Sequence, residues 1–334
     1  MKTTAFAMAA CFVALALGGC QEPGGFLIRA VPADQTLKET AVGGDQAWAA
    51  DKIAIVDLDG LIVNQRMTGW FGSGENPVSL LAEKLDKAGA DARVKAVVLR
   101  INSPGGTVLA SEVAYDMVRR FRQRSGKPVI ACIADVGASG GYYVACAGDR
   151  IVAQPASITG SIGVIIQTVS FAGTMRLLGI TADAVTSGPH KEMGSPLKPL
   201  SEEDRKLFQG MVDQFYGRFV DVVARSRTKL PREKVRELAD GRVYTGQQAL
   251  ELGLVDQLGD MELAVDEAKK AARLTRARLV MYHRPLGYRG NAYAQTPAPA
   301  PVSQVNLINV ECPELMTLRR PAFLYLWTTD LSAP

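Results

Sequence analysis

The sequence predicts an α/β fold, built as one domain over residues 51–294. Apolar runs of strand length alternate with amphipathic stretches of helix length through the middle of the chain. Glycine-rich turns join them, and one turn, Gly137-Ala138-Ser139-Gly140-Gly141, places a serine between a predicted strand and a predicted helix. A sharp strand-to-helix turn lifts one side chain clear of a sheet and aims backbone N–H groups beside it. The chemistry of this chain is therefore expected at Ser139.

The N-terminal end has the pattern of an export signal. Lys2 precedes an apolar run over residues 5–17, which is shorter than the about 20 residues of a membrane span. Small residues then lead to Cys20, as in the bacterial lipobox, and that resemblance implies a lipid-modified Cys20 after removal of a lipoprotein-type signal peptide, residues 1–19. The alternative is an uncleaved membrane anchor. Both interpretations tether the chain to a membrane and place its bulk on the extracytoplasmic, periplasmic side. Residues 20–50 are then expected to be a flexible tether.

The predicted elements follow in order along the chain. Buried strands are expected at 53–58, 96–101, 128–134 and 150–153, and helices at 78–88, at 108–124 and directly after Ser139. Residues 181–185 resemble a strand, 186–196 a turn-rich loop, and 201–239 an amphipathic helix. The apolar stripe of that helix is expected to form core and subunit interface; it comprises Phe208, Met211, Val212, Phe215, Phe219, Val222 and Val223.

The C-terminal end contains a proline-rich linker, residues 295–303, and a tail of unknown role, residues 304–334. The apolar segment 323–327 in that tail is expected to pack back on the domain as an edge strand. It is also compatible with a partner-binding or self-blocking segment, and the sequence does not choose between these.

Composition excludes several classes of function. The formal net charge of +4 over 334 residues is too small to indicate nucleic-acid binding. Cys132 and Cys146 lie in predicted core elements and are interpreted as small apolar residues. With Cys312 they are the three cysteines that remain once Cys11 leaves with the signal and Cys20 is acylated, which is an odd number. The chain has no metal-ligand spacing and no phosphate-binding glycine loop, so no metal and no cofactor are expected.

A serine nucleophile needs a base, and the chain has only two histidines. His283 with Asp256 or Asp260 would follow the order of an α/β-hydrolase. It stands beside a proline-marked polar tail, however, and is predicted to be a solvated surface residue. Lys191, in the loop 186–196, can act as a base only where its ammonium form is disfavoured; the residues alone favour a solvated lysine. The neighbouring His190 is expected to point to solvent.

Five motifs in order resemble the signal peptide peptidase family of Ser–Lys serine proteases, in its single-domain bacterial form. The resemblance spans about residues 52–275. The motifs are Asn102-Ser103-Pro104-Gly105-Gly106, Gly137-Ala138-Ser139-Gly140-Gly141-Tyr142-Tyr143, Thr159-Gly160-Ser161-Ile162-Gly163-Val164, Ser187-Gly188-Pro189-His190-Lys191 and Gly241-Arg242-Val243-Tyr244-Thr245-Gly246.

This resemblance implies a role for each matching residue. Ser139 would be the nucleophile and Lys191 the general base, with Ser161 hydrogen-bonded to the lysine amine. The N–H groups of Gly106 and Gly140 would form the oxyanion hole, since glycine permits the close approach that such a site needs. The fold implied is the spiral of ββα units shared with Clp proteases and crotonases, and the assembly implied is a homo-oligomeric ring with serine and lysine on neighbouring subunits.

The function implied is a membrane-tethered serine endopeptidase that cleaves apolar signal peptides after their release from exported preproteins. The alternatives are an α/β-hydrolase with a Ser-His-Asp triad and an inactive crotonase-like lipoprotein scaffold. An acyl-CoA enzyme conflicts with export. A Clp-like Ser-His-Asp protease is disfavoured because no histidine lies between Ser139 and Pro189.

Overall fold

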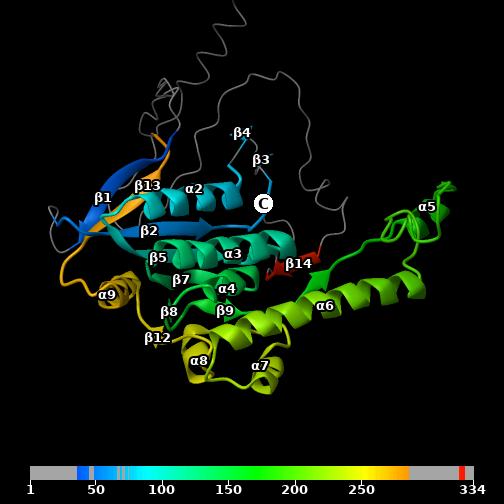
Figure 1. Cartoon of the computed structure of the whole chain (residues 1–334). Helices are drawn as coiled ribbons and strands as arrows, with labels where there is room; N and C mark the ends of the chain where they lie inside the picture. Colours follow the sequence, from blue (N-terminus) through cyan, green and yellow to red (C-terminus); the bar gives the residue numbers. More distant parts are fainter. Residues whose placement is uncertain are drawn as a thin grey trace, which may run out of the picture. The chain divides into compact units, whose positions relative to one another are not determined.

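The computed structural model describes residues 36–44, 49–65, 68–69, 72–73, 75–285 and 323–327. All of them belong to one compact unit, residues 34–334. They form helices around a nine-stranded, mostly parallel sheet, which confirms the α/β class (Figure 1). The finer ββα spiral stays a prediction. The signal segment, Cys20, Cys312 and the linker 295–303 lie outside the described residues, and within those residues no helix is long and apolar enough to cross a membrane.

The main sheet has the strand order β1, β13, β2, β5, β7, β8, β12. All neighbours from β13 to β12 are parallel, and β1 pairs antiparallel with β13. The second half of β7 pairs with β9 instead of β8, and β9 pairs with β11. The bounds are β1 Lys38–Gly44, β2 Lys52–Asp59, β5 Val94–Ser103, β7 Val129–Ala138, β8 Arg150–Ala153, β9 Ile158–Gly160, β11 Val243–Thr245, β12 Gln257–Leu258 and β13 Arg278–His283.

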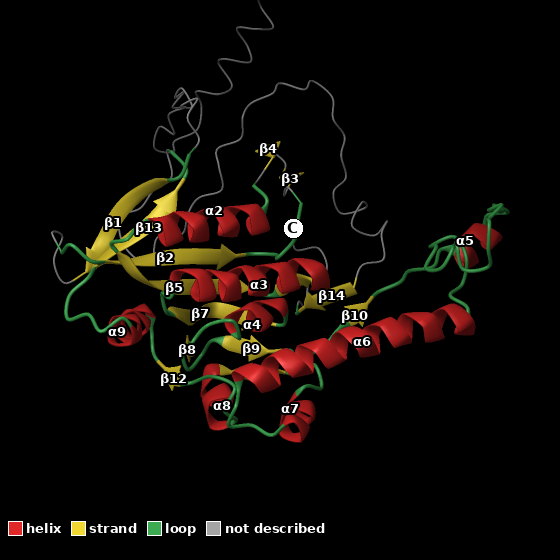
Figure 2. Cartoon of the chain, viewed as in Figure 1, coloured by secondary structure: helices red, strands yellow, loops and turns green. Residues whose placement is uncertain are grey.

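Alternate residues of each strand point to opposite faces, so the sheet has two cores. In β2, Ala54 and Val56 pack with α2, α3, α4 and α6, whereas Ile53 and Ile55 pack with α9. Figure 2 shows these helices in place around the strands. The bounds are α2 Pro77–Ala90, α3 Val108–Ser125, α4 Gly140–Ala145, α6 Glu202–Ser226 and α9 Met261–Ala271. The predicted strands and helices before residue 155 are confirmed, with bounds that agree to within a few residues.

Three predicted segments before residue 240 differ from the structure. Residues 38–44, predicted as part of the tether, form β1, because β13 offers them an edge to pair with. Residues 181–185 form no strand. Val185 is fully exposed, and the alternating apolar and polar residues of this segment have no neighbouring strand to pair with. The helix predicted over 201–239 is two helices, because α6 ends at Ser226 and α7, Arg232–Leu238, begins directly after Pro231.

The tail also differs from its prediction. Strand β14, Phe323–Leu326, is not an edge strand but the central strand of a three-stranded sheet, between β10, Ile165–Ile166, and β6, Gly105–Thr107. It is antiparallel to both. The remaining short elements are β3 Thr68–Gly69, β4 Gly72–Ser73, α5 Ala172–Leu177 and α8 Gly246–Glu251.

Candidate active site

Ser139 occupies a strained turn between β7 and α4. Its φ of 52° and ψ of −116° lie in a region that residues with a Cβ rarely adopt. Two backbone bonds hold it there: its N–H donates to the Gly160 carbonyl at 2.8 Å, and its carbonyl accepts from the Tyr143 N–H at 2.9 Å. Ser139 is only 1% exposed. The strand-to-helix turn expected from the glycines is therefore present, and it holds the serine in one orientation.

Ser161 lies beside Ser139. In the parallel pairing of β7 with β9, Ala138 is opposite Gly160, so the two serines follow paired residues on neighbouring strands. Adjacent strands are about 4.8 Å apart. Ser161 also has a positive φ, 48°, and its N–H donates to the Arg242 carbonyl at 2.8 Å. The structure brings these two predicted site residues together.

The turn before α3 presents the N–H of Gly106. The Ser103 hydroxyl accepts from the Gly105 N–H at 3.1 Å and fixes the turn from within. On one side, the Gly105 carbonyl accepts from the Ile62 N–H, and the Thr107 N–H donates to the Ile62 carbonyl. The backbone N–H and C=O groups of successive residues in a strand point to opposite sides, so the Gly106 N–H points away from Ile62. A Cβ on Gly106 would overlap the Ile62 carbonyl oxygen, so only glycine fits.

Gly140 is the first residue of α4, where backbone N–H groups lack partners within the helix. A Cβ there would overlap the hydroxyl oxygen of Ser111 and would lie 3.1 Å from the Gly105 Cα. The turn with Gly106 and the start of α4 are therefore in direct contact. Both predicted oxyanion donors lie at this junction, next to Ser139.

Lys191 lies elsewhere. Residues 167–200, here called the arm, contain α5 and lead into α6, and Figure 1 shows α5 beyond the far end of α6, well away from α4. Lys191 is exposed, and its backbone N–H donates to the Gly188 carbonyl at 3.2 Å. A single chain therefore does not bring Lys191 to Ser139. The arm is rich in exposed apolar side chains, among them Phe171, Leu177, Leu178, Ile180 and Val185.

The sequence predicts that His190 points to solvent, but its ring contacts two carboxylates. Its Nδ1 is 2.9 Å from Asp204 Oδ1 and its Nε2 is 3.5 Å from Glu203 Oε1. The hydrogen bond with His190 lowers the pKa of the Asp204 carboxyl. The loop beside Lys191 is thereby attached to the first turn of α6.

His283 is buried, so its prediction as a solvated surface residue is wrong. It is 7% exposed in β13, where β1 covers it; Nε2 is 2.8 Å from Thr40 Oγ1, and Nδ1 is 2.6 Å from the Arg284 carbonyl. Strand β13 is three strand positions from β7, or about 14 Å. Asp256 instead accepts from Arg227 at 2.9 Å, and Asp260 caps α9. These residues do not form a triad with Ser139.

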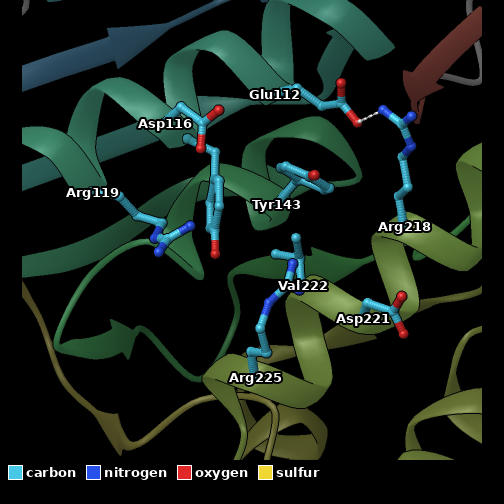
Figure 3. Close-up of a pocket in the computed structure, with 9 residues that line it drawn as sticks. Glu112, Asp116, Arg119, Tyr143, Arg218, Asp221, Val222 and Arg225 are labelled. Atoms are coloured by element: carbon cyan, nitrogen blue, oxygen red, sulfur yellow. Dashed lines mark hydrogen bonds and ion pairs between the residues drawn. The ribbon is translucent and has the colours of Figure 1, made fainter.

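A pocket of about 260 Å³ lies between α3, α4 and α6 (Figure 3). Its charges are balanced, and Arg218 contacts Glu112 at 3.4 Å across it. It contains neither of the two site serines nor a lysine, so we do not assign the chemistry to it. Its lining residues are Glu112, Tyr115, Asp116, Arg119, Tyr143, Arg218, Asp221, Val222 and Arg225. Over the described ranges, no cluster of three or more histidine, cysteine or acidic side chains could hold a metal ion.

Known proteins match most of this chain in sequence. Residues 121–275 match the model of peptidase family S49. The chain is 38% identical over 250 residues to an Enterococcus faecium protein named "Putative signal peptide peptidase SppA", covering 75% of this chain and 70% of that protein. The chain belongs to the signal peptide peptidase family. It is 37% identical to Protease 4 of Salmonella typhi over 69% of this chain and 36% of that protein, and 35% identical to the chloroplastic serine protease SPPA of Arabidopsis thaliana over 67% and 33%. Membership in the family makes this chain a serine peptidase.

Sequence reasoning missed two aromatic residues of this peptidase. Tyr143, one turn after Ser139, stacks on Tyr325 of β14 with ring centroids 5.2 Å apart. The sequence shows two adjacent tyrosines after the glycines, but it does not show that Tyr143 packs on another aromatic ring, because that ring belongs to a residue 182 positions later in the chain (143 to 325).

Proposed function

We propose that this serine peptidase is an endopeptidase of the Ser–Lys type that cleaves apolar signal peptides after their release from exported preproteins. One observation supports it above the others. The strained Ser139 stands beside Ser161 and at the junction where the N–H groups of Gly106 and Gly140 meet. That arrangement offers a nucleophile, a hydroxyl to orient a base, and two donors for an oxyanion.

The proposed mechanism uses only these groups. The Ser139 hydroxyl attacks the substrate carbonyl while the Lys191 amine takes its proton. The N–H groups of Gly106 and Gly140 stabilise the oxyanion of the tetrahedral intermediate, which collapses as the lysine returns the proton to the leaving amine. Water then hydrolyses the acyl-enzyme by the same route in reverse.

Assembly would complete the site. A lysine acts as a base only where burial disfavours its charged form, and Lys191 is exposed in one chain. The arm that contains it presents apolar side chains to solvent, which is typical of a surface that another subunit covers. We therefore propose a homo-oligomeric ring of ββα-type subunits in which Lys191 of one copy reaches Ser139 and Ser161 of the next.

The sequence supports the location and the substrate that we propose. The export pattern of residues 1–19 supports a membrane tether, through a lipid on Cys20 or an uncleaved anchor, with the peptidase outside the cytoplasm. Apolar signal peptides would remain at that membrane, and an extended apolar peptide is a natural ligand for a groove with a strand on each side.

A subunit-mixing experiment tests the mechanism. The substrate is an apolar, signal-like peptide with a fluorophore and a quencher. Lys191→Ala and Ser139→Ala should each be inactive. His283→Ala is the control, because His283 is the other residue considered as the base, and this variant should stay active. Refolding the two inactive variants together at equal amounts should restore about a quarter of wild-type activity, because a random ring places intact serine beside intact lysine at one junction in four. An inactive His283→Ala with an active Lys191→Ala would overturn the base assignment, and no recovery on mixing would overturn the shared site.

A further inference from the structure

Strand β7 contains extra residues shortly before the nucleophile turn. It pairs with β8 up to Ile133 and with β9 over its last three residues. Ile133 is also opposite Ile101 of β5. Two residues later on β5, Ser103 is opposite Gly137, which lies four residues later on β7. Residues 134–136, here called the bulge, therefore take the place of one residue in a regular ladder. Bulges next to active sites commonly redirect a side chain.

The bulge sets the register of the proposed site. Gly140 follows Gly137 by three residues, and Gly106 follows Ser103, the partner of Gly137, by three residues as well. The two predicted oxyanion donors are therefore level with each other because β7 has two extra residues. The change of neighbour from β8 to β9 also brings the turn against the strand that precedes Ser161. A regular strand in place of the bulge would separate these groups.

Side chains from neighbouring segments hydrogen-bond the backbone of the bulge and of the residue that follows it. The three bonds are these: Asn102 Oδ1 accepts from the Val136 N–H at 3.2 Å, the Ser157 hydroxyl donates to the Ala134 carbonyl, and the Thr159 hydroxyl donates to the Gly137 carbonyl at 2.8 Å. Ser157 and Thr159 are buried. A buried polar group that loses its partner costs roughly 1–3 kcal/mol, so these bonds favour one shape of the bulge.

Hydrogen bonds define this shape more than apolar packing does. Asp135, at the tip of the bulge, is exposed, and Ala134 and Val136 are only partly buried. The two ends of the bulge are in close contact, since a Cβ on Gly137 would lie 2.7 Å from the Ile133 side chain. The loss of one hydrogen bond is therefore expected to shift the bulge, and the turn with it, while the surrounding core stays intact.

We propose that Asn102, Ser157 and Thr159 are positioning residues for the peptidase reaction, because through the bulge they hold Ser139 level with its two oxyanion donors. This inference rests on the proposed function, in which Ser139 is the nucleophile. The three side chains act on the backbone behind the turn and not on the substrate. Their loss should slow the chemical step and leave substrate binding unchanged, since a misplacement of about 1 Å can cost about 100-fold in rate.

A matched pair of variants at Thr159 tests the hydroxyl. Thr159→Val keeps the shape of the side chain and loses the donor, so kcat for the signal-like peptide should fall at least about tenfold, with KM within about twofold of wild type. Thr159→Ser keeps the donor, and its kcat should stay within about threefold of wild type. Both are compared with wild type at the same oligomeric size. Equal kcat in the two variants would overturn the proposal.

Thr40→Val is the control for the loss of a hydroxyl from another part of the same sheet. The Thr40 hydroxyl is 2.8 Å from His283 Nε2, between β1 and β13. Its removal should lower the free energy of unfolding and leave kcat within about twofold of wild type, because the two sites are independent. If Thr40→Val loses as much kcat as Thr159→Val, the effect is general destabilisation and the proposal fails.

A double variant tests whether the side chains act through one element. Ser157 and Thr159 hydrogen-bond different carbonyls of the same short segment. Ser157→Ala should lower kcat like Thr159→Val, and the double variant should lose less than the product of the two single losses, because coupled residues are not additive. A loss equal to the full product would show independent effects and contradict a shared bulge.

Labelling by a fluorophosphonate separates this inference from the proposed function. In this reaction the Ser139 hydroxyl loses its proton, and its oxygen displaces fluoride from phosphorus. Thr159→Val should be labelled at least about tenfold more slowly than wild type and Thr159→Ser, with Ser139→Ala unlabelled. That pattern in a chain that cleaves no signal-like peptide would sink the proposed function alone. Cleavage that depends on Ser139, with equal labelling rates in wild type and both Thr159 variants, would sink this inference alone.

Asn102→Ala provides the test if Thr159→Val does not fold. Asn102 is only partly buried, and its backbone carbonyl, which accepts from the Gly60 N–H, is kept in this variant. The Val136 N–H loses its acceptor, so kcat and the labelling rate should both fall about fivefold or more, with KM unchanged. Wild-type values of both rates in folded Asn102→Ala would overturn the proposal.

Discussion

The backbone strain at Ser139 predicts that glycine at this position stabilises the fold while it removes activity. A residue with a Cβ at φ 52° and ψ −116° is held against its preference by the Gly160 and Tyr143 hydrogen bonds. Glycine adopts these angles without that penalty. Ser139→Gly should therefore be inactive and more stable than wild type, whereas Ser139→Ala should be inactive and keep the strain.

The expected magnitude follows from two opposing effects. A residue in a sparsely populated backbone region carries a strain of roughly 1–3 kcal/mol. Glycine is more flexible in the unfolded chain, which offsets about 0.5–1 kcal/mol of the gain. The free energy of unfolding of Ser139→Gly should thus exceed that of Ser139→Ala by about 0.5–2 kcal/mol. For a domain of this size, each kcal/mol corresponds to a shift of roughly 2–4 °C in Tm.

Thermal and urea unfolding of the two variants, at one protein concentration, measure this difference. Ala138→Gly is the control: the preceding residue, fully buried in β7, has no positive φ, so glycine there should destabilise the fold by about 1 kcal/mol or more. If Ser139→Gly is no more stable than Ser139→Ala, the turn stores no strain and the reasoning fails.

Three further predictions concern other parts of the domain. Gly106→Ala should lower kcat/KM for the signal-like peptide at least about 100-fold, because its Cβ would overlap the Ile62 carbonyl and displace the N–H; wild-type turnover would contradict the assignment. Burial raises the pKa of Asp59 from 3.8 to about 6, so the folded chain holds this proton more tightly than the unfolded one, and stability should fall by up to roughly 3 kcal/mol between pH 4 and pH 6 and above. Urea titrations at pH 5 and pH 8 should show a smaller fall in Asp59→Asn, and an equal fall would refute this. Burial also raises the pKa of Cys132 to about 12 and of Cys146 to about 11, so iodoacetamide at pH 8 should label both only in urea, and mass spectrometry that finds them labelled in the folded chain would count against it.

The sequence was sufficient where structure depends on neighbouring residues. The apolar runs predict β2, β5 and β7 because a central parallel strand must be apolar on both faces. The turn at Ser139 is predictable as well, because its glycines mark a close approach of the chain: a Cβ on Gly140 or Gly141 would overlap atoms of the neighbouring elements. The placement of Ser161 beside Ser139 followed from the family resemblance, and the register of β7 with β9 now gives it a structural basis.

The errors all concern contacts between distant segments. His283 looked exposed because nothing near it in the sequence shows that β1, more than 230 residues earlier (44 to 278), covers it. The segment 181–185 alternates like a strand, yet local alternation cannot supply a pairing partner. The apolar character of residues 323–327 is visible in the sequence, but their register against Gly106 is not. Pairing over such distances depends on the assembled surface, and one sequence does not encode that surface locally.

The two parts of the proposed site differ in how firmly the chain holds them. Ser139 directly follows a ten-residue strand that is hydrogen-bonded on both sides and covered by helices, so it should be released only when the whole domain unfolds. Lys191 lies in an exposed arm attached through the contacts of His190 with α6. Mild heat or denaturant would free the arm while the sheet remains intact. Inactivation would then precede unfolding, and it would be reversible on return to native conditions.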